Sequence, residues 1–238
     1  ALAFLSKIYS SINHVKSKYF IIDHKLRVGS TKEAIKVKKI LNKYSIHAEI
    51  LTWHGKKPIK NIQSLARKKR YDLLLSKSRK LKIKNILLGH HQNDLFENFF
   101  IRILRGSGLK GIISLDKKSK IDEINLLRPL LDQKKEDLIF ISKQVFNFYV
   151  KDPFNEDEKF LRIGLRKLIN ELEKKGLDSK KFNKTIQNLK YSNEAISFYV
   201  KKNIDLNSSY SVKKKRIILN KKFFQQPYEV IFRSFSDL

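Results

Sequence analysis

The side chains best suited to chemistry gather in residues 89–98, which read Gly-His-His-Gln-Asn-Asp-Leu-Phe-Glu-Asn. His90 and His91 supply imidazoles, and the carboxylates of Asp94 and Glu97 share one face of a helix because they are three residues apart. Such a set could bind a divalent metal, since imidazole and carboxylate suit zinc, iron or manganese. It could instead hold the ammonium of an amine substrate, with a histidine against a phosphate.

The structural interpretation of the same residues is that Asp94 complements a helix dipole and that Glu97 is solvated. For Glu97 alone this interpretation is the better one. Two imidazoles and two carboxylates so close together nevertheless favour a functional site.

A second candidate is the glycine-rich run at residues 105–111, which reads Arg-Gly-Ser-Gly-Leu-Lys-Gly. Glycines let the backbone turn and expose N–H groups, and Arg105 adds a bidentate phosphate donor. We therefore expect Arg105, Gly106 and Gly108 to contact a phosphate. An ordinary glycine stop at the end of a helix explains the same pattern equally well.

Other basic side chains are candidates for binding anions. Arg67 and Arg70 lie three apart on a predicted helix, and His24 follows an apolar strand where a nucleotide would sit. Arg162 and Arg166, four apart, form a patch suited to RNA phosphates. The plain alternative for the arginines is a solvated basic face, and for His24 it is a strand-exit turn.

Short apolar runs alternate with helical patterns in the first half of the chain. Strands are expected at residues 19–22, 48–53 and 85–89, and helices from Ser30, from Asn61 and near Asp94. The spacing of Ser30 and Glu33 is that of a capping box. Strands separated by helices indicate βαβ units, hence an α/β fold with a parallel sheet whose ligand sites lie at the carboxyl ends of its strands.

The pattern changes near residue 150, beyond which helices are expected at 158–173 and 182–202 without clear strands between them. We therefore predict a domain at 1–150 and a smaller, mainly helical domain at 151–238. The Lys-rich segment 211–219 fits either a strand or an extended segment.

Composition narrows the classes of function. The formal charge of +29 indicates a polyanionic partner, although abundant Lys, Ile and Asn are also what a codon bias toward A and T would produce. The absence of Cys excludes disulfides and cysteine nucleophiles. The sequence holds neither G-x-x-x-x-G-K-[ST] nor G-x-G-x-x-G, so a Walker ATPase or a dinucleotide enzyme lacks its main motif. No apolar run approaches the length of a membrane span, and we expect a cytoplasmic protein with no membrane partner.

Taken in order, these motifs resemble those of tRNA(Ile)-lysidine synthetases, which are N-type PP-loop ATP pyrophosphatases. The matching segments are Asp23-His24-x-Leu26-Arg27, Asn61-x-Gln63-x-x-Ala66-Arg67-x-x-Arg70-Tyr71, His90-His91-x-x-Asp94-x-x-Glu97, Arg105-Gly-Ser-Gly108-Leu-x-Gly111, Arg128-Pro-Leu-Leu131 and Asp152-Pro-x-Asn155-x-Asp157. The resemblance covers about residues 1–175 and is weaker beyond them. It implies a Rossmann-like parallel sheet with flanking helices, of the PP-loop ATPase type, followed by a helical tRNA-binding domain.

The resemblance implies an ATP-dependent carbon–nitrogen ligase. Such enzymes use ATP, with Mg²⁺, to adenylate the carbonyl oxygen at C2 of the wobble cytidine in tRNA(Ile) with a CAU anticodon. The ε-amine of lysine then attacks C2 and displaces AMP to form lysidine. By analogy, Asp94 and Glu97 would hold the lysine ammonium, and Arg67 and His90 would contact the ATP phosphate or the adenylate. The remaining assignments are His24, Arg70, Arg105, Gly106 and Gly108 for the nucleotide, and Arg162 and Arg166 for tRNA. No protein ligand to a metal is expected.

Two departures from the family pattern lead to further expectations. The Ser-Gly-Gly-x-Asp-Ser loop that binds pyrophosphate should lie directly before Ala1, so we expect a fragment that binds ATP poorly and is nearly inactive. The pattern Arg-Asn-Arg-Ile-Arg reads Arg-Ile-Gly-Leu-Arg at 162–166, and the chain stops inside an expected tRNA-recognition region. The natural chain is therefore expected to extend at both ends.

Three alternatives stay open from the sequence: a PP-loop tRNA thiolase, which the absence of Cys disfavours; a metallohydrolase built on residues 90–97; and a basic RNA-binding module without catalysis. The oligomeric state is also open, with a homodimer as one option.

Overall fold

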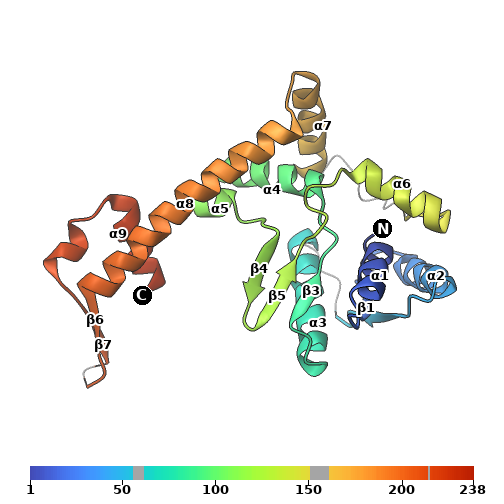
Figure 1. Cartoon of the computed structure of the whole chain (residues 1–238), viewed down its shortest axis with the longest axis horizontal. Coiled ribbons are helices and arrows are strands. Elements are labelled where there is room, and N and C mark those ends of the chain that lie inside the picture. The colour runs from blue at the N-terminus through green and yellow to red at the C-terminus, as the bar shows by residue number, and fades with distance from the viewer. Residues whose placement is uncertain (56–61, 151–160, 214) are drawn as a thin grey trace. The chain divides into compact units, whose positions relative to one another are not determined.

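The computed structural model describes residues 1–55, 62–150, 161–213 and 215–238. The chain forms two compact units, which are treated separately below (Figure 1). The first unit comprises Ala1–Glu97 with Asp116–Gly164, and the second comprises Asn98–Leu115 with Leu165–Leu238. The domain boundary expected near residue 150 stays a prediction.

The strands of the first unit form two small sheets. Strands β1 (Tyr19–Asp23) and β2 (Ala48–Thr52) pair in parallel, as do β3 (Asn85–Leu87) and β5 (Ile124–Leu127). Strand β4 (Lys118–Ile121) joins β5 in an antiparallel hairpin. The three predicted strands are present and their pairing is parallel, whereas the β4–β5 hairpin was not predicted.

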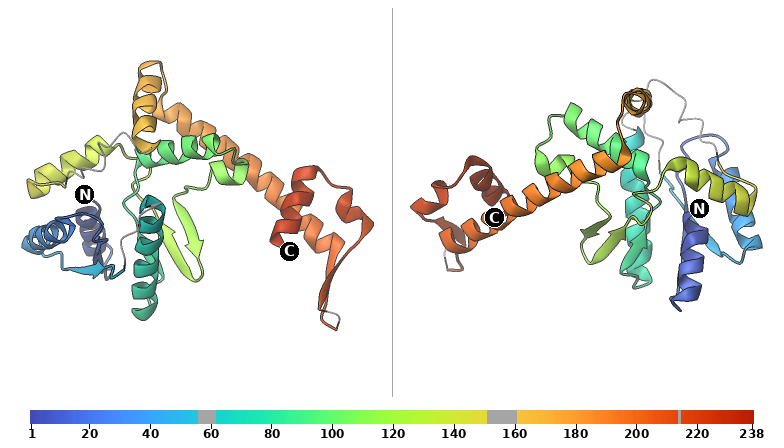
Figure 2. Two further views of the ribbon diagram at one scale, coloured as in Figure 1. Left: turned by 180° about the vertical axis from the view of Figure 1, so that it is seen from behind. Right: turned by 45° about the horizontal axis from the view of Figure 1, so that its top comes forward.

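Helices of the first unit separate these strands along the chain, as Figures 1 and 2 show. They are α1 (Leu2–Ile12), α2 (Ser30–Lys43), α3 (Ile62–Lys80), α4 (Gln92–Leu104), α6 (Lys135–Phe146) and α7 (Leu161–Lys174), of which α4 and α7 continue into the second unit. The predicted helix start at residue 61 lies outside the described residues. Among the described helices, none has both the length and the apolar character needed to cross a membrane.

The core of the first unit is built around α3. Its Leu74 and Leu75 are buried in one cluster with Ile86 and Leu88, at and just after β3, and with Ile124 and Leu126 of β5. Partly buried side chains of the other sheet, Phe20, Ile22 and Leu51, pack against this cluster. One helix face thus covers strands from both sheets, and this shared burial holds the strand ends in fixed positions.

The start of α2 differs from the predicted capping box. Gly29, with φ of +91°, occupies the N-cap position and no side chain caps the helix. The Ser30 and Thr31 hydroxyls instead donate to the Asp23 carboxylate, at 2.9 and 2.6 Å. Glu33 pairs with Arg27 rather than reaching back to the helix start. The prediction was wrong because a buried carboxylate at the end of β1 competes for the same hydroxyls.

The second unit is organised by the long helix α8 (Ser179–Asn207). It also contains the short helix α5 (Leu109–Ile112), a hairpin of β6 (Ser208–Ser211) and β7 (Arg216–Leu219), a 3₁₀ turn (Lys221–Phe224) and α9 (Tyr228–Asp237). The segment 211–219, which the sequence left open, therefore belongs to a hairpin and ends in a strand.

Buried polar side chains join α8 to α9 and to the 3₁₀ turn. The Asn203 amide donates to Ser234 Oγ at 3.1 Å and to the Phe223 carbonyl at 3.4 Å, and Asn207 donates to Asn203 Oδ1 at 2.9 Å. Asn203 and Ser234 are only 2% and 0% exposed. Because buried polar groups are costly without partners, this network favours a single register between the two helices.

The shared core gives a stability prediction. Ile124→Ala, at a position 3% exposed, should lower the free energy of unfolding of the first unit by about 2–5 kcal/mol, because it leaves a cavity beside α3. Ile12→Ala, at a position 71% exposed on α1, is the matched control and should change it by less than about 0.5 kcal/mol. Urea unfolding followed by circular dichroism measures both, and equal losses would show that this core does not stabilise the unit.

Candidate functional site

The histidine turn lies between β3 and α4, at the carboxyl end of a parallel strand. The His91 backbone N–H donates to Asp94 Oδ2 at 2.9 Å, and His91 Nε2 lies 3.5 Å from the same oxygen. Asp94 is thus in the first turn of α4, where a carboxylate is stabilised by the helix dipole. Oδ2 makes both contacts with His91, so the side chain can still offer Oδ1 to a ligand.

The two carboxylates of this segment differ in accessibility. The Asp94 side chain is 25% exposed, whereas Glu97 as a whole is only 2% exposed. The interpretation of Glu97 as a solvated residue was therefore wrong, because one turn along the helix the face that carries Asp94 turns into the interior. A buried carboxylate is retained where it is compensated, so Glu97 forms the inner part of the candidate site and Asp94 the outer part.

Positive charge surrounds His90. The pKa of His90 is lowered to about 4, chiefly by burial and in part by the charges of Arg128, Arg67 and Arg70, against the opposing effect of Asp94. Arg67 and Arg70 lie exposed on α3, and the Arg67 guanidinium is 5.4 Å from the centre of the Tyr71 ring. His90 is consequently neutral at physiological pH and faces groups that attract anions.

The turn after β1 contributes His24 to the same edge. Burial lowers the pKa of His24, and the charge of Arg70 lowers it further while Asp23 opposes the shift. Asp23 itself is 2% exposed. Its burial raises the pKa, but hydrogen bonds from Thr31, Lys25 and Ser30 outweigh this and leave the pKa lowered. Asp23 therefore stabilises the turn, and His24 is the member of this pair that a ligand could meet.

The structure thus brings five of the predicted residues to one edge of the first unit: His24, Arg67, Arg70, His90 and Asp94. Buried ring nitrogens there lack a hydrogen-bond partner among the described residues, namely Nδ1 of His24, His90 and His91. Imidazoles with unused nitrogens beside guanidinium groups are suited to a phosphate-bearing ligand. The adjacent Asp94 is suited to a cation.

The glycine-rich segment lies in the second unit and has a clear structural role. Gly106 has φ of +64°, its N–H donates to the Ile103 carbonyl at 2.9 Å, and the Ser107 N–H donates to the Arg102 carbonyl at 2.9 Å. This pattern is the Schellman ending of α4, which requires a left-handed residue. The helix-stop interpretation is therefore confirmed for Gly106, and phosphate binding by Arg105, Gly106 and Gly108 stays a prediction.

The predicted arginine patch is only partly visible. Segment 152–157 lies outside the described residues, and so does the side chain of Arg162. Arg166 is half-buried on α7, in the part of that helix that belongs to the second unit. A role of both arginines in binding tRNA stays a prediction.

The metal interpretation gains no geometric support where the structure is described. Within residues 1–55, 62–150, 161–213 and 215–238, no three side chains of His, Asp or Glu converge closely enough to hold an ion. Residues 90–97 therefore do not present a ready set of metal ligands.

Arg128 is the feature of this edge to which the sequence assigned no role. It follows β5 directly and is 4% exposed, and its charge acts on His90. Its position directly after an apolar run could have placed Arg128 at the sheet edge, but the run at 124–127 was not recognised as a strand. Burial of a guanidinium cannot be read from a chain with 52 basic residues.

The similarity to known proteins covers the segment that contains these residues. The sequence profile described as "PP-loop domain" matches residues 1–173. The tRNA(Ile)-lysidine synthase of Bradyrhizobium diazoefficiens is 33% identical over 175 residues, covering 74% of this chain and 48% of the relative. That of Orientia tsutsugamushi is 38% identical (63% and 34% covered), and that of Wolbachia pipientis wMel is 30% identical (89% and 49% covered). The chain thus spans at most about half the length of these relatives.

A solved structure with a similar fold is the U34-tRNA thiolase NcsA of Methanococcus maripaludis, which contains a [4Fe-4S] cluster. The TM-score is 0.63 at 15% identity, covering 81% of this chain and 68% of the other. At this identity the match concerns the fold alone, and it confirms the predicted α/β class of the PP-loop type.

The environment of His90 gives a pH prediction. Because its folded pKa, about 4, is below the unfolded value, the unfolded chain binds a proton between about pH 6.5 and 4 that the folded chain does not. Stability should therefore fall as pH falls through this window, and His90→Gln should flatten the loss. Nuclear magnetic resonance of the ring should show a midpoint near pH 4. The same change at the exposed His14 is the control, and an unshifted His90 would contradict the described electrostatics.

Proposed function

This chain belongs to the PP-loop domain family, and from that premise we propose that it is the core of an ATP-dependent enzyme that modifies tRNA. More specifically, we propose ligation of lysine to C2 of the wobble cytidine of tRNA(Ile), through an adenylated intermediate. The similarity to proteins named tRNA(Ile)-lysidine synthase supports this reaction. The chain would act in the cytoplasm, where tRNA is used.

The proposal rests on one observation. Side chains that favour an anion and a side chain that favours a cation lie next to each other at one sheet edge. Arg67, Arg70 and the neutral His90 favour an anion, and Asp94, next to them, favours a cation. Lysine transfer to an adenylated base needs both, because the leaving group is a phosphate monoester and the attacking group arrives as an ammonium. Arranging the two side by side converts a bimolecular encounter into a positioned reaction.

Within this proposal each residue has a defined task. Asp94 contacts the ε-ammonium of lysine, and Glu97 behind it orients the amine and accepts its proton. Arg67 and His90 bind the phosphate of ATP and then of the adenylate, with Arg70 and His24 beside the nucleotide. Mg²⁺ would enter with ATP and would supply neutralisation of its phosphate charge, and no described side chain is assigned to it.

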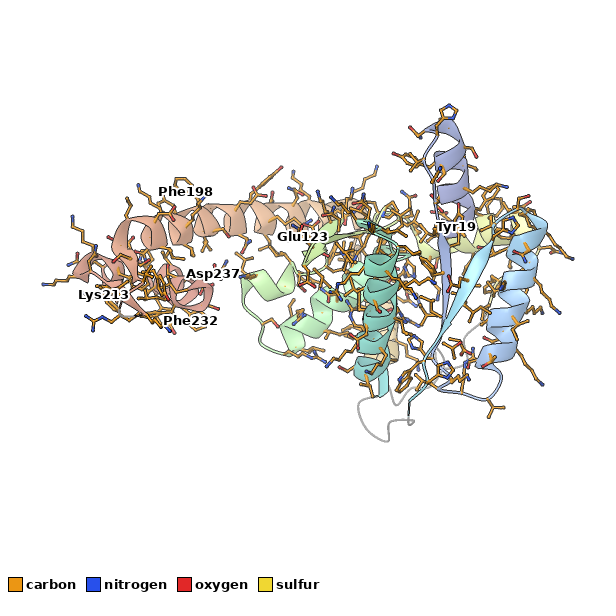
Figure 3. The ribbon with its side chains drawn as sticks, turned by 90° about the horizontal axis from the view of Figure 1, so that it is seen from below. Tyr19, Glu123, Phe198, Lys213, Phe232 and Asp237 are labelled. Atoms are coloured by element: carbon orange, nitrogen blue, oxygen red, sulfur yellow. The ribbon has the colours of Figure 1, made fainter. Side chains whose placement is uncertain are left out.

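A basic and aromatic face of α8 supports tRNA as the partner. Exposed side chains recur there at intervals of three or four residues: Lys181, Lys184, Asn188, Tyr191, Ala195, Phe198, Lys202 and Leu206. Figure 3 shows Phe198 projecting from this helix. Lysines neutralise phosphates and aromatic rings stack on unpaired bases, so this face would contact RNA. Arg162 and Arg166 are proposed as further residues that bind the tRNA.

A second candidate function is RNA binding without catalysis. The net charge of +29 favours it, since charge alone supplies sequence-independent affinity. A thiolase of the kind found by fold similarity is disfavoured, because its cluster would need ligands and this chain has no Cys.

The ligase proposal predicts separate effects on chemistry and on binding. Asp94→Asn and Glu97→Gln should each reduce labelled lysine incorporation into CAU-anticodon tRNA(Ile) by about 100-fold or more, because the amine loses its carboxylate. Affinity for tRNA should change little. The assay requires ATP and is run on this chain and on the chain with a Ser-Gly-Gly-x-Asp-Ser loop and strand from a relative joined before Ala1.

The outcomes separate the two candidate functions. ATP-dependent incorporation that Glu97→Gln removes would establish the ligase. Salt-sensitive tRNA binding with no incorporation in either form would leave the RNA-binding function. Full activity of both variants would show that the carboxylates were assigned wrongly.

The α8 face predicts a change in salt dependence. Replacing Lys181, Lys184 and Lys202 together by Gln should reduce the slope of log affinity for tRNA against log salt by about two to three. The matched control replaces three exposed lysines of α2, Lys32, Lys39 and Lys43. Filter binding between low and moderate salt measures both, and equal slopes in the two triple variants would exclude a specific role of α8.

A further inference from the structure

The register between β3 and β5 places Arg128 beside the histidine turn. Leu87 is paired with Leu127, and the Leu88 N–H donates to the Leu127 carbonyl at 2.8 Å. Immediately beyond this bond, the segment after β3 continues into the His90 turn and the segment after β5 continues into Arg128. A second bond, from the Gln92 N–H to the Gln133 carbonyl at 3.0 Å, rejoins the two segments. Arg128 therefore leaves the same end of the ladder as the His90 turn, between two backbone hydrogen bonds that join the segments.

The guanidinium of Arg128 is buried and only partly satisfied. Nη1 donates to the Asp116 carbonyl at 2.7 Å and to Ser119 Oγ at 3.0 Å, which are neutral acceptors. Nε is buried and has no hydrogen-bond partner among the described residues. An arginine stays charged even when buried, and burial of a charge without a counter-ion is costly. The cost of burying this charge indicates that Arg128 has a function that a neutral side chain could not perform.

The surroundings indicate what the charge acts on. Nδ1 of His90 is likewise buried without a partner in the described part of the chain, and Arg67 and Arg70 add positive charge from α3. Against these three arginines stands the carboxylate of Asp94. The buried guanidinium of Arg128 and the unused Nδ1 of His90 are together suited to an anion at the His90 side of the edge.

We propose that Arg128 is a positioning residue of this site, a fixed buried cation that draws the phosphate group of a nucleotide to the His90 turn. It acts through space and through the turn it supports, whereas the exposed Arg67 makes the direct contact. The identity of the ligand as a nucleotide rests on the proposed function. The inference that an anion binds at this site does not rest on the proposed function.

The first test measures binding of inorganic pyrophosphate to the full chain by nuclear magnetic resonance titration. Arg128→Met should weaken binding by about tenfold or more, and Arg128→Lys, which keeps the charge, should stay within about threefold. The His90 titration midpoint should rise in Arg128→Met, because a nearby positive charge is lost, and should stay near the parental value in Arg128→Lys, which keeps that charge. Unchanged binding in Arg128→Met would overturn the proposal.

A second pair of variants keeps the test decisive if Arg128→Met does not fold. Ser119→Asp places a carboxylate against Nη1 and cancels the charge without removing the arginine, and Ser119→Asn is the neutral control of the same size. The proposal expects weak pyrophosphate binding in the first and parental binding in the second. Equal losses in the two would show that Arg128 only clamps the β4–β5 hairpin.

The test also separates this inference from the proposed function. Pyrophosphate binding that depends on Arg128, without lysine transfer in any form of the protein, supports the anion site and rejects the ligase. Lysine transfer at the parental rate in Arg128→Met rejects the positioning role and leaves the ligase in place.

Discussion

The parallel pairing of β3 with β5 is the interaction on which the candidate site depends. Parallel strands end at the same edge, so the residues that follow them meet there although they are far apart in sequence. Only three residue pairs form this ladder, from Asn85 with Asn125 to Leu87 with Leu127. So short a pairing is stable because Leu74 and Leu75 of α3 cover it, and α3 also presents Arg67 and Arg70. Burial and charge placement are thus two results of one packing arrangement.

Electrostatics at this edge depends on which charges are buried. The chain carries a large positive excess, mostly on exposed lysines that water screens. The buried exceptions, Asp23, Glu97 and Arg128, act at short range in a medium of lower dielectric. Asp23 is stabilised as a carboxylate by its hydrogen bonds and serves the fold. Glu97 and Arg128 lie near the two places where a cation and an anion are expected, which gives the site its polarity.

Periodicity in the sequence was enough to locate β1, β2, β3 and most helices, because apolar residues recur in them as short runs or at helical intervals. It did not reveal the hairpin of β4 and β5, since Lys118–Ile121 alternates weakly and is largely exposed. Residue chemistry identified His90 and Asp94 but not how deeply Glu97 is buried, which depends on packing from other segments. The capping box at Ser30 failed for a similar reason, because local spacing cannot anticipate a distant acceptor such as Asp23.

The buried link between α8 and α9 has a consequence for how this chain can change over generations. Asparagine is abundant in a composition biased toward A and T, and most such residues could be exchanged freely. Asn203 cannot, because it donates to Ser234 and also accepts from Asn207. Replacing one member by an apolar residue leaves the others without this partner in the interior at a cost of about 1–3 kcal/mol, so changes at the three positions are coupled. In this part of the protein, selection therefore acts on the three positions as a group rather than on each residue separately.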